Sequence, residues 1–238
     1  MPKKAVGGNC GNFDYKNSFL SFAPLMEDQD IKNKILRGAE ELFMKFGVRS
    51  VSMDDVARHL SVSKKTIYQY FADKDELITS VSKSHMERDK VEFEKIHADA
   101  ANAIDELVKI SEAMARDFKN MNPALLYDLQ KFHPNAWNVW LDYKNDYIRQ
   151  SVVRNLKQGI SEGYFRPEVN TEVLAILRIN TVELGFSDQL FPPDRFDLVD
   201  VQMQVFEHFI LGLLTDKGRK LYDRYKTKES RTQETPIL

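Results

Sequence analysis

Apolar residues recur at helical spacing through most of the chain from Ile31 onward. The first stripe consists of Ile31, Ile35, Ala39, Leu42, Phe43 and Phe46. Spacings of mostly three or four residues place one apolar face on an amphipathic helix, and Gly47 is expected to end that helix. No segment alternates apolar and polar residues for long enough to predict a strand. The pattern therefore predicts an all-α protein.

Residues that cap helices mark where the next helices begin. Ser52 is followed three residues later by Asp55, and Asp73 by Glu76, a spacing that satisfies free N–H groups in a first helical turn. Ser63 can cap a short helix between these two pairs. The helix after Asp73 is expected to run to about residue 98. Further helices are expected at about residues 101–121, 123–132, 134–162, 171–189 and 195–215.

The stretch from Met53 to Leu77 predicts two short helices joined by a tight turn and followed at once by a third helix. This is the layout of a helix-turn-helix, which places one helix in the major groove of DNA. The small residue Ala57 stands where the two helices cross. The apolar anchors on the inner faces are Val56, Leu60, Val62 and Ile67.

Ser61 occupies the middle of the predicted turn. Many such turns carry glycine there, because the backbone adopts a positive φ. A residue with a side chain pays roughly 1 kcal/mol for the left-handed conformation. We therefore expect a slightly weakened turn within an intact helix-turn-helix frame.

These segments resemble the tetracycline-repressor (TetR) family of transcriptional regulators. The matching pieces are ILRGAEELFMKFG, SVSMDDVARHLSVSKKTIYQYF and ADKDEL, and together they cover about Ile31 to Leu77. Further along, QGISEGYFRPEVN resembles the joint between the last helices of the family's ligand domain. The sequence departs from the family pattern at Ser61 and at Lys65, where a small residue is frequent.

The resemblance implies an N-terminal three-helix DNA-binding domain and a larger helical domain for ligand binding and dimerisation. We expect the DNA-binding domain at residues 28–75 and the helical domain at residues 76–226. Glycine and asparagine residues break the helical pattern ahead of residue 28, so residues 1–27 are expected to form a flexible tail. Residues 1–25 are expected to be dispensable for folding and DNA binding, and Met26 is a candidate natural start. A polar tail is expected at residues 227–238.

Lys64, Lys65 and Thr66 open the predicted recognition helix, at the end that meets base edges in the groove. A lysine there can donate to guanine O6 and N7, or it can hold a phosphate. Outside this frame, a lysine pair could equally be solvated surface. We expect these three residues to contact DNA, and Lys65 to influence which bases are preferred.

Three residues downstream are expected to contact the phosphate backbone. Tyr68 offers a hydroxyl for a phosphate oxygen, and Tyr70 either does the same or packs its ring inward. Lys74 lies in the first turn of the next helix, where its ammonium and the free backbone N–H groups would converge on one phosphate.

Charge composition does not by itself indicate a nucleic-acid binder. The formal net charge is -2, and residues 27–80 hold nine basic and ten acidic side chains. The DNA prediction therefore rests on where the basic residues lie. The single cysteine, Cys10, excludes an internal disulfide, and no apolar run has the roughly 20 residues of a membrane helix. We expect a cytoplasmic protein with no membrane partner.

Aromatic residues share a face of the helix predicted at 134–162. Trp137, Trp140, Tyr143 and Tyr147 recur at three or four residues, and Tyr127 comes from the preceding segment. The resemblance implies a small-molecule pocket in this domain, so Tyr127, Trp137, Trp140 and Tyr143 are candidates for contact with an unknown effector. The alternative is an ordinary core, which aromatic stripes form more often. His133 is expected to be a local cap or a surface residue.

The segment 171–189 is apolar on nearly every side, which is typical of a helix buried on several faces. Arg178, Asn180 and Glu183 interrupt it, and buried polar groups need partners. That partner could be a second subunit, an internal residue or a ligand, so Asn180 and Glu183 are further effector candidates. The resemblance implies a homodimer formed through the last two large helices.

Enzyme and metal-site patterns are weak in this chain. Glu94 and His97 match one half of a di-iron motif without a second copy, and Asp55 with His59 offers only two ligands at helical spacing. No phosphate-binding loop and no nucleophile elbow occur. We expect no catalytic residue, no metal and no cofactor. An alternative is a helical interaction protein whose helix-turn-helix no longer binds DNA.

The residues and the resemblance together predict a homodimeric transcriptional repressor. It would bind double-stranded DNA at a near-palindromic operator and leave it when a small-molecule effector binds. The sequence leaves the effector, the operator and the regulated genes undefined, and repression and activation both stay open.

Overall fold

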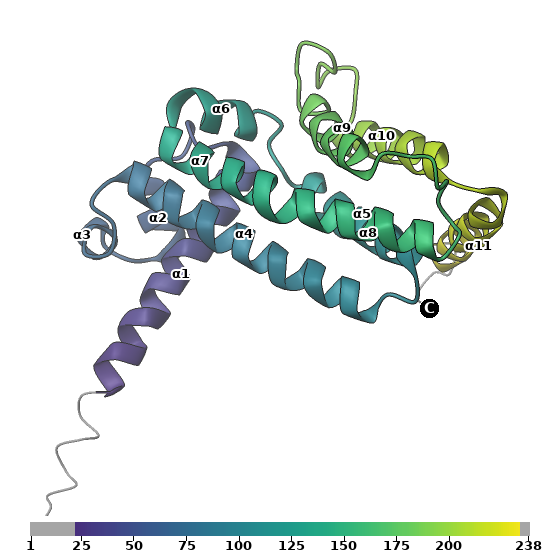
Figure 1. Ribbon diagram of the computed structural model, residues 1–238. Helices are drawn as coiled ribbons and strands as arrows, with labels where there is room; N and C mark the ends of the chain where they lie inside the picture. The colour runs from purple at the N-terminus through teal and green to yellow at the C-terminus, as the bar shows by residue number, and fades with distance from the viewer. Residues whose placement is uncertain (1–21, 234–238) are drawn as a thin grey trace, which may run out of the picture.

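The computed structural model describes residues 22–233, and every named element within them is helical, which confirms the all-α prediction (Figure 1). In chain order the elements are α1 (Phe22–Phe46), α2 (Met53–Leu60), α3 (Lys64–Tyr68), α4 (Lys74–Asp99), α5 (Ala103–Lys119), α6 (Leu125–Phe132), α7 (Pro134–Asp142), the π-helical segment η1 (Tyr143–Ile148), α8 (Arg149–Ser161), α9 (Thr171–Leu184), α10 (Leu198–Leu213) and α11 (Asp216–Gln233). None of the helices in this range is both long and apolar enough to cross a membrane.

Side-chain caps begin α2, α3 and α4 where the sequence predicts them. Ser52 and Asp55 form a reciprocal capping box at α2, and Ser63 accepts from the backbone N–H of Thr66 at α3. At α4 the Asp73 carboxylate accepts from the backbone N–H of Glu76 at 2.8 Å. These caps fix the starts of all three helices around the turn.

Both ends of the described chain are more helical than predicted. Helix α1 begins at Phe22, within the predicted tail, and Pro24 is compatible with this start because its missing N–H costs no hydrogen bond in a first turn. Helix α11 was not predicted, since its few apolar residues give a weak stripe, yet Tyr222 is buried against the C-terminal core. The tail predicted at residues 227–238 is therefore helical to Gln233. Residues 1–21, with Cys10, and 234–238 lie outside the described range.

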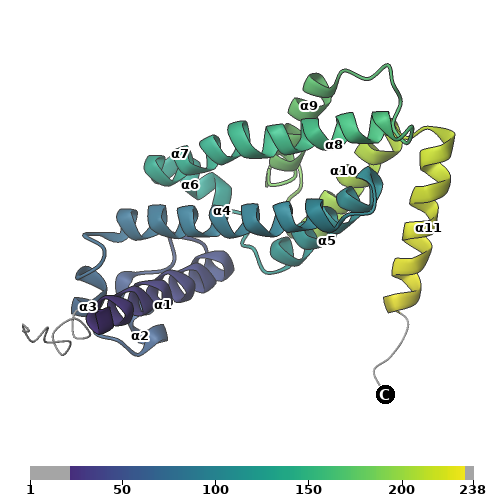
Figure 2. The ribbon, with the colours of Figure 1, turned by 60° about the horizontal axis from the view of Figure 1, so that its bottom comes forward.

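Two hydrophobic cores hold the helices together. The first joins α1, α2, α3 and the start of α4 to α6 and α7, through residues such as Leu129 and Ala136. The second joins α5, α8, α10 and α11 around Leu156, Phe165 and Ile210. Helices α2 and α3 lie at one end of the molecule and α9–α11 at the other, with α4 running between them (Figures 1 and 2). The core of the helix-turn-helix therefore includes residues of the larger helical part.

Candidate DNA interface and ligand cavities

The turn between α2 and α3 has the geometry that the sequence predicts. Ser61 adopts φ 54° and ψ 40°, and among the described residues it is the only non-glycine with a positive φ. Its backbone N–H donates to the Arg58 carbonyl at 3.2 Å, and the N–H of Val62 donates to the Ala57 carbonyl at 3.0 Å. These bonds satisfy the end of α2 and hold the serine in its left-handed conformation.

The three residues that open α3 differ in their internal partners. Lys64 donates from Nζ to Asp54 Oδ2 at 3.0 Å, and this hydrogen bond raises the pKa of Lys64. The Thr66 hydroxyl lies 2.8 Å from the Ser63 hydroxyl. Lys65 is exposed, and within residues 22–233 its side chain has no hydrogen bond or ion pair. Of the three, only Lys65 can reach a base without giving up an internal partner.

The three predicted phosphate contacts have different surroundings. Tyr68 is exposed over 44% of its surface and faces solvent. Tyr70 is half-buried against the first core, and its hydroxyl donates to Asp28 Oδ1 at 2.8 Å, which raises its pKa. Lys74 begins α4 and is half-buried, and this burial lowers its pKa. Tyr68 and Lys74 therefore suit a phosphate contact better than Tyr70 does.

Two adjoining cavities lie in the helical part, holding about 140 Å³ and about 120 Å³. The first, called here the proximal cavity, is walled by α1, α4, α5, α6, α7, η1 and the end of α9, and it borders the helix-turn-helix. The second, the distal cavity, lies between α4, α5, α8, α9 and α10. The side chains that line both are Phe93, Met114, Trp140, Ile148 and Val182.

Two of the six predicted effector residues line these cavities. Trp140 contributes to both and Tyr143 to the proximal one. Glu183 lies behind Trp140 and accepts from its Nε1 at 3.0 Å and from Lys144 Nζ at 2.9 Å.

The other three candidates lie away from the cavity walls. Tyr127 is 54% exposed, and Trp137 packs against the first core. Asn180 is exposed and donates from Nδ2 to the Ile176 carbonyl at 2.8 Å. His133 stands between α6 and α7, and its Nδ1 lies 2.6 Å from Asp75 Oδ1 in the first turn of α4. That contact joins the helical part to the helix-turn-helix.

An ionisable cluster that the sequence did not predict forms one wall of the proximal cavity. His85 lies 2.6 Å from Glu40 through Nδ1 and 3.4 Å from Asp89 through Nε2, while Arg88 also pairs with Glu40. Asp117 of α5 faces the same cavity. The four-residue step from His85 to Asp89 is visible in the sequence. The partner Glu40 lies 45 residues away, and only folding brings it there.

The pKa values of the residues in this cluster are shifted in different directions. Burial is the largest single effect on Glu40 and on His85 and opposes ionisation of both. The hydrogen bond between them, the Arg88 hydrogen bond to Glu40 and the surrounding opposite charges together outweigh it, so the pKa of Glu40 falls and that of His85 rises. Burial raises the pKa of Asp89 to about 6, and it raises the pKa of Asp117 as well. At neutral pH, Asp89 is therefore a carboxylate held in an environment that favours its protonated form.

Asp89→Asn is expected to stabilise the fold at neutral pH. The pKa of Asp89 is about 6 when folded and about 4 when unfolded. Between these values the folded state keeps a proton that the unfolded state releases. The associated stability is complete below about pH 4 and is lost as the pH rises through about 6. The difference between the folded and unfolded pKa values corresponds to about 3 kcal/mol, so the free energy of unfolding of the variant should rise by up to that amount at pH 7.

Urea unfolding at several pH values measures this gain. Glu87→Gln, which neutralises an exposed acid two residues earlier on α4, is the matched control and should change little at any pH. An equal gain for Asp89→Asn at pH 4 and pH 7 would contradict the prediction, because the proton linkage requires the gain to vanish at low pH.

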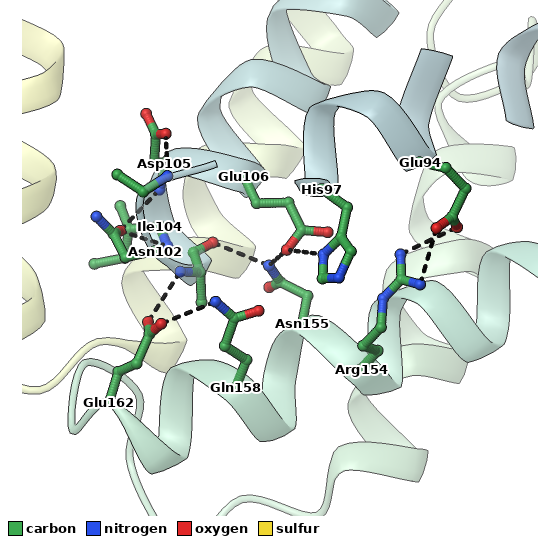
Figure 3. Close-up of polar contacts among 12 residues, drawn as sticks. Glu94, His97, Asn102, Ile104, Asp105, Glu106, Arg154, Asn155, Gln158 and Glu162 are labelled. Atoms are coloured by element: carbon green, nitrogen blue, oxygen red, sulfur yellow. Dashed lines mark hydrogen bonds and ion pairs between the residues drawn. The ribbon is translucent and has the colours of Figure 1, made fainter. Parts of the chain in front are cut away.

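A second polar network includes three residues of the distal-cavity wall, Glu106, Arg154 and Asn155 (Figure 3). Asn155 donates from Nδ2 to Glu106 Oε2 at 2.9 Å, and His97 Nδ1 lies 3.1 Å from the same oxygen. Arg154 donates two hydrogen bonds to Glu94, at 3.1 and 3.2 Å. Glu94 and His97 thus have separate partners, and within residues 22–233 no three His, Cys, Asp or Glu side chains are arranged so that they could hold a metal ion.

The helix-turn-helix region matches a known family by sequence. Residues 35–81 match the model of the bacterial regulatory proteins of the tetR family. The helix-turn-helix region is therefore one of the tetR family. An uncharacterised regulator of Bacillus subtilis, YvaF, is 28% identical over 89 residues, 37% of this chain and 47% of that protein. The repressor KstR2 of Mycobacterium tuberculosis is 21% identical over 146 residues, 60% of this chain and 73% of that protein. The chain thus spans about half the length of the Bacillus relative that it matches.

Solved structures agree on the fold beyond the matched region. A putative regulator of Saccharomonospora viridis in complex with choline aligns with a TM-score of 0.67, at 19% identity, over 79% of this chain and 99% of that one. KstR2 itself aligns with a TM-score of 0.55 over 77% of this chain and 95% of that one. The family match of the helix-turn-helix region and the names of the relatives support a DNA-binding transcriptional regulator. The similar proteins are transcriptional regulators, which confirms the expectation that this chain is not an enzyme.

Proposed function

We propose that this regulator is a homodimeric repressor that binds a near-palindromic operator and is released by a small molecule in its helical part. The observation that carries the proposal is the exposed, unpaired Lys65 at the start of α3, beside the exposed Tyr68 and the first residue of α4, Lys74. Together they offer one base-reading cation and two phosphate-binding groups on one side of the helix-turn-helix. In this proposal residues 28–75 bind DNA, and residues 76–226 bind the effector and form the dimer.

An apolar face on α9 supports dimerisation. The exposed apolar residues of this helix are Val173, Ile176, Leu177 and Leu184, each between 46% and 57% accessible. Contiguous exposed apolar surface of this kind marks an interface. Pairing α9 and α10 with their copies would bury it. A twofold axis there would present two α3 helices to successive major grooves.

The proximal cavity connects the ligand site to the DNA-binding helices. Its wall includes Glu40 and Phe43 of α1, so an occupant contacts the helix-turn-helix unit directly. Two further contacts link the parts: the His133–Asp75 pair at 2.6 Å, and the Asn122 N–H donated to the Met44 carbonyl at 2.6 Å. An occupant that fits one arrangement of these helices better than another would shift the position of α3.

The names of similar proteins point to several ligand chemistries. One solved structure contains choline, one belongs to a ketosteroid regulator, and one to a fatty acid degradation regulator. Choline is a cation, whereas ketosteroids and fatty acids are largely apolar. Aromatic and methionine side chains accommodate both kinds of compound. The cavities here are lined by such residues, including Phe93, Met114 and Trp140.

Lys65→Ala and Lys74→Met are expected to weaken DNA binding in different ways. Removing Lys74 takes away a phosphate contact, so affinity should fall to a similar degree for every sequence, and the salt dependence should become shallower by roughly one ion per subunit. Removing Lys65 should cost about 1–3 kcal/mol at preferred sites and relax the preference for one base pair. Fragments selected from the source genome by the wild-type chain, titrated at several salt concentrations, provide the measurement.

Lys95→Ala is the matched control, because it removes an exposed lysine near the far end of α4. Its affinity should equal that of the wild type. If Lys65→Ala kept both affinity and base preference, the base-reading role of Lys65 would be wrong. If the wild-type chain selected no fragments at all, the helical interaction protein without DNA binding would become the better description.

A further inference from the structure

Arg178 of α9 has an unusual position in the distal cavity. Its guanidinium lies over the rings of Phe206 and Phe209, with the central carbon 5.4 and 5.8 Å from the ring centroids. Its Nη1 is inaccessible to solvent and has no hydrogen-bond partner within the described residues. Arg178 therefore places a positive charge against an apolar wall with one donor unsatisfied, which costs free energy in the empty protein.

No carboxylate among the described residues of the cavity wall forms an ion pair with Arg178. Burial lowers the pKa of Arg178 to about 10, and no neighbouring acid opposes that effect. The acids nearby have partners of their own: Glu106 pairs with His97 and Asn155, and Glu94 with Arg154 (Figure 3). Within the described residues, Arg178 thus has no acidic partner of its own.

Two more buried polar atoms without hydrogen-bond partners belong to side chains of the same wall. They are Asn155 Oδ1 and Arg154 Nε. Buried polar atoms in folded proteins almost always have partners. Arg178 Nη1 and Arg154 Nε are both donors, so a bound acceptor group would satisfy them, whereas Asn155 Oδ1 is an acceptor and would need a donor of its own.

We propose that the distal cavity binds an amphipathic monocarboxylate, whose carboxylate pairs with Arg178 and whose apolar body extends toward the proximal cavity. A guanidinium fork matches the two oxygens of a carboxylate. A single arginine neutralises one negative charge, so a dianionic phosphate would leave a charge buried and unpaired. The inference deepens the proposed function and rests on these cavities being the effector site.

The two cavities adjoin, which gives the apolar body a direction in which to extend. Phe93, Met114 and Val182 line both cavities, so a chain held at Arg178 would pass between them toward the helix-turn-helix. At the proximal end it would contact Phe43 of α1 and Ile78 of α4. A longer body would therefore press on the DNA-binding helices, and a shorter one would not reach them.

A second copy of the chain is the main alternative partner for Arg178. Helical spacing argues against it. Arg178 comes three residues after the buried Ala175 and four before the cavity-lining Val182, so these three share a face. The exposed apolar face around Leu177 lies on another side of α9.

Titration calorimetry of the full chain with ligands of matched length tests the proposal. The probes are decanoate, the neutral decanol and the cationic decyltrimethylammonium at pH 8, with hexanoate and tetradecanoate to vary the length. Decanoate or another of the carboxylates should bind at least about thirtyfold more tightly than the neutral and cationic probes. If no carboxylate bound, or if decanol bound as tightly as the best carboxylate, the proposal would be overturned.

Arg178→Met keeps the apolar bulk and removes the charge. It should lower carboxylate affinity by about thirtyfold or more and leave decanol binding unchanged. Arg178→Gln is a second variant that keeps a hydrogen-bond donor. Arg116→Met, which removes an exposed arginine on α5, should leave every affinity unchanged. Unaltered carboxylate binding in both Arg178 variants would overturn the assignment.

Two further readouts separate this inference from its alternatives. Thermal unfolding of the ligand-free Arg178→Met chain should occur at a higher temperature, because an uncompensated buried charge has gone. A lower dimer affinity with unchanged carboxylate binding would instead assign Arg178 to the subunit interface and overturn the inference. DNA release is measured separately: carboxylate binding that leaves the DNA complex intact would support the Arg178 site and contradict effector release.

Discussion

Leu177→Glu is expected to convert the regulator to a monomer and to abolish tight operator binding. Leu177 is 50% exposed at the centre of the apolar face of α9. Two glutamates brought together by a twofold axis would bury like charges in an apolar interface, which costs several kcal/mol. A monomer engages one half-site only, so operator affinity should fall by a factor on the order of a hundred or more.

Light scattering during size exclusion measures the oligomeric state, and titration with a selected DNA fragment measures the affinity. Val91→Glu is the matched control, because Val91 is an exposed apolar residue on α4, 64% accessible and away from α9. It should remain dimeric and bind DNA normally. A Leu177→Glu chain that stayed dimeric at micromolar concentration would place the interface on another surface.

The helix-turn-helix could be predicted from sequence because its determinants are local. The caps at Ser52, Ser63 and Asp73 act within three residues of themselves, and the positive φ of Ser61 follows from the length of the turn. Helix α11 escaped prediction because its stability comes from contacts with a distant core, made by Tyr222 and its neighbours, rather than from its own polar sequence.

The chemistry of the site was less predictable because it depends on pairs that folding creates. The Lys64–Asp54 bond spans ten residues and the Tyr70–Asp28 bond spans 42, so neither follows from helical periodicity. Aromatic spacing indicated the correct helix for the cavity, yet only Trp140 and Tyr143 of the predicted set reach its wall. A face shared along one helix does not reveal which neighbouring helices close around it.

The second core depends on a close approach between α8 and the chain that follows it. The last turn of α8 ends in a left-handed glycine, Gly163, and the N–H of Tyr164 donates to the Gly159 carbonyl at 2.9 Å. This reversal lays the buried ring of Phe165 directly on the backbone of Gly159. From there the N–H of Arg166 donates to the Leu213 carbonyl at 2.8 Å, which ties the reversal to α10.

Gly159→Ala is expected to destabilise the fold by about 3 kcal/mol or more. A Cβ at this position would lie 2.0 Å from Cδ2 of Phe165, far inside van der Waals contact. The ring is 1% exposed and cannot move without opening the core around it. Overpacking of this kind costs about 1–3 kcal/mol and occasionally more. That loss exceeds the gain of up to about 1 kcal/mol that alanine brings to a helix interior.

Gly212→Ala makes the same change where the protomer leaves room, because no described atom outside the neighbouring turns of α10 itself lies within 4 Å of the added methyl group. Thermal unfolding of both variants separates the two contributions. Gly212→Ala should unfold at or above the wild-type midpoint, whereas Gly159→Ala should fall by roughly 6–12 °C. If the two variants unfolded together, the contact with Phe165 would contribute little, and the reversal after α8 would have to be held by its backbone hydrogen bonds instead.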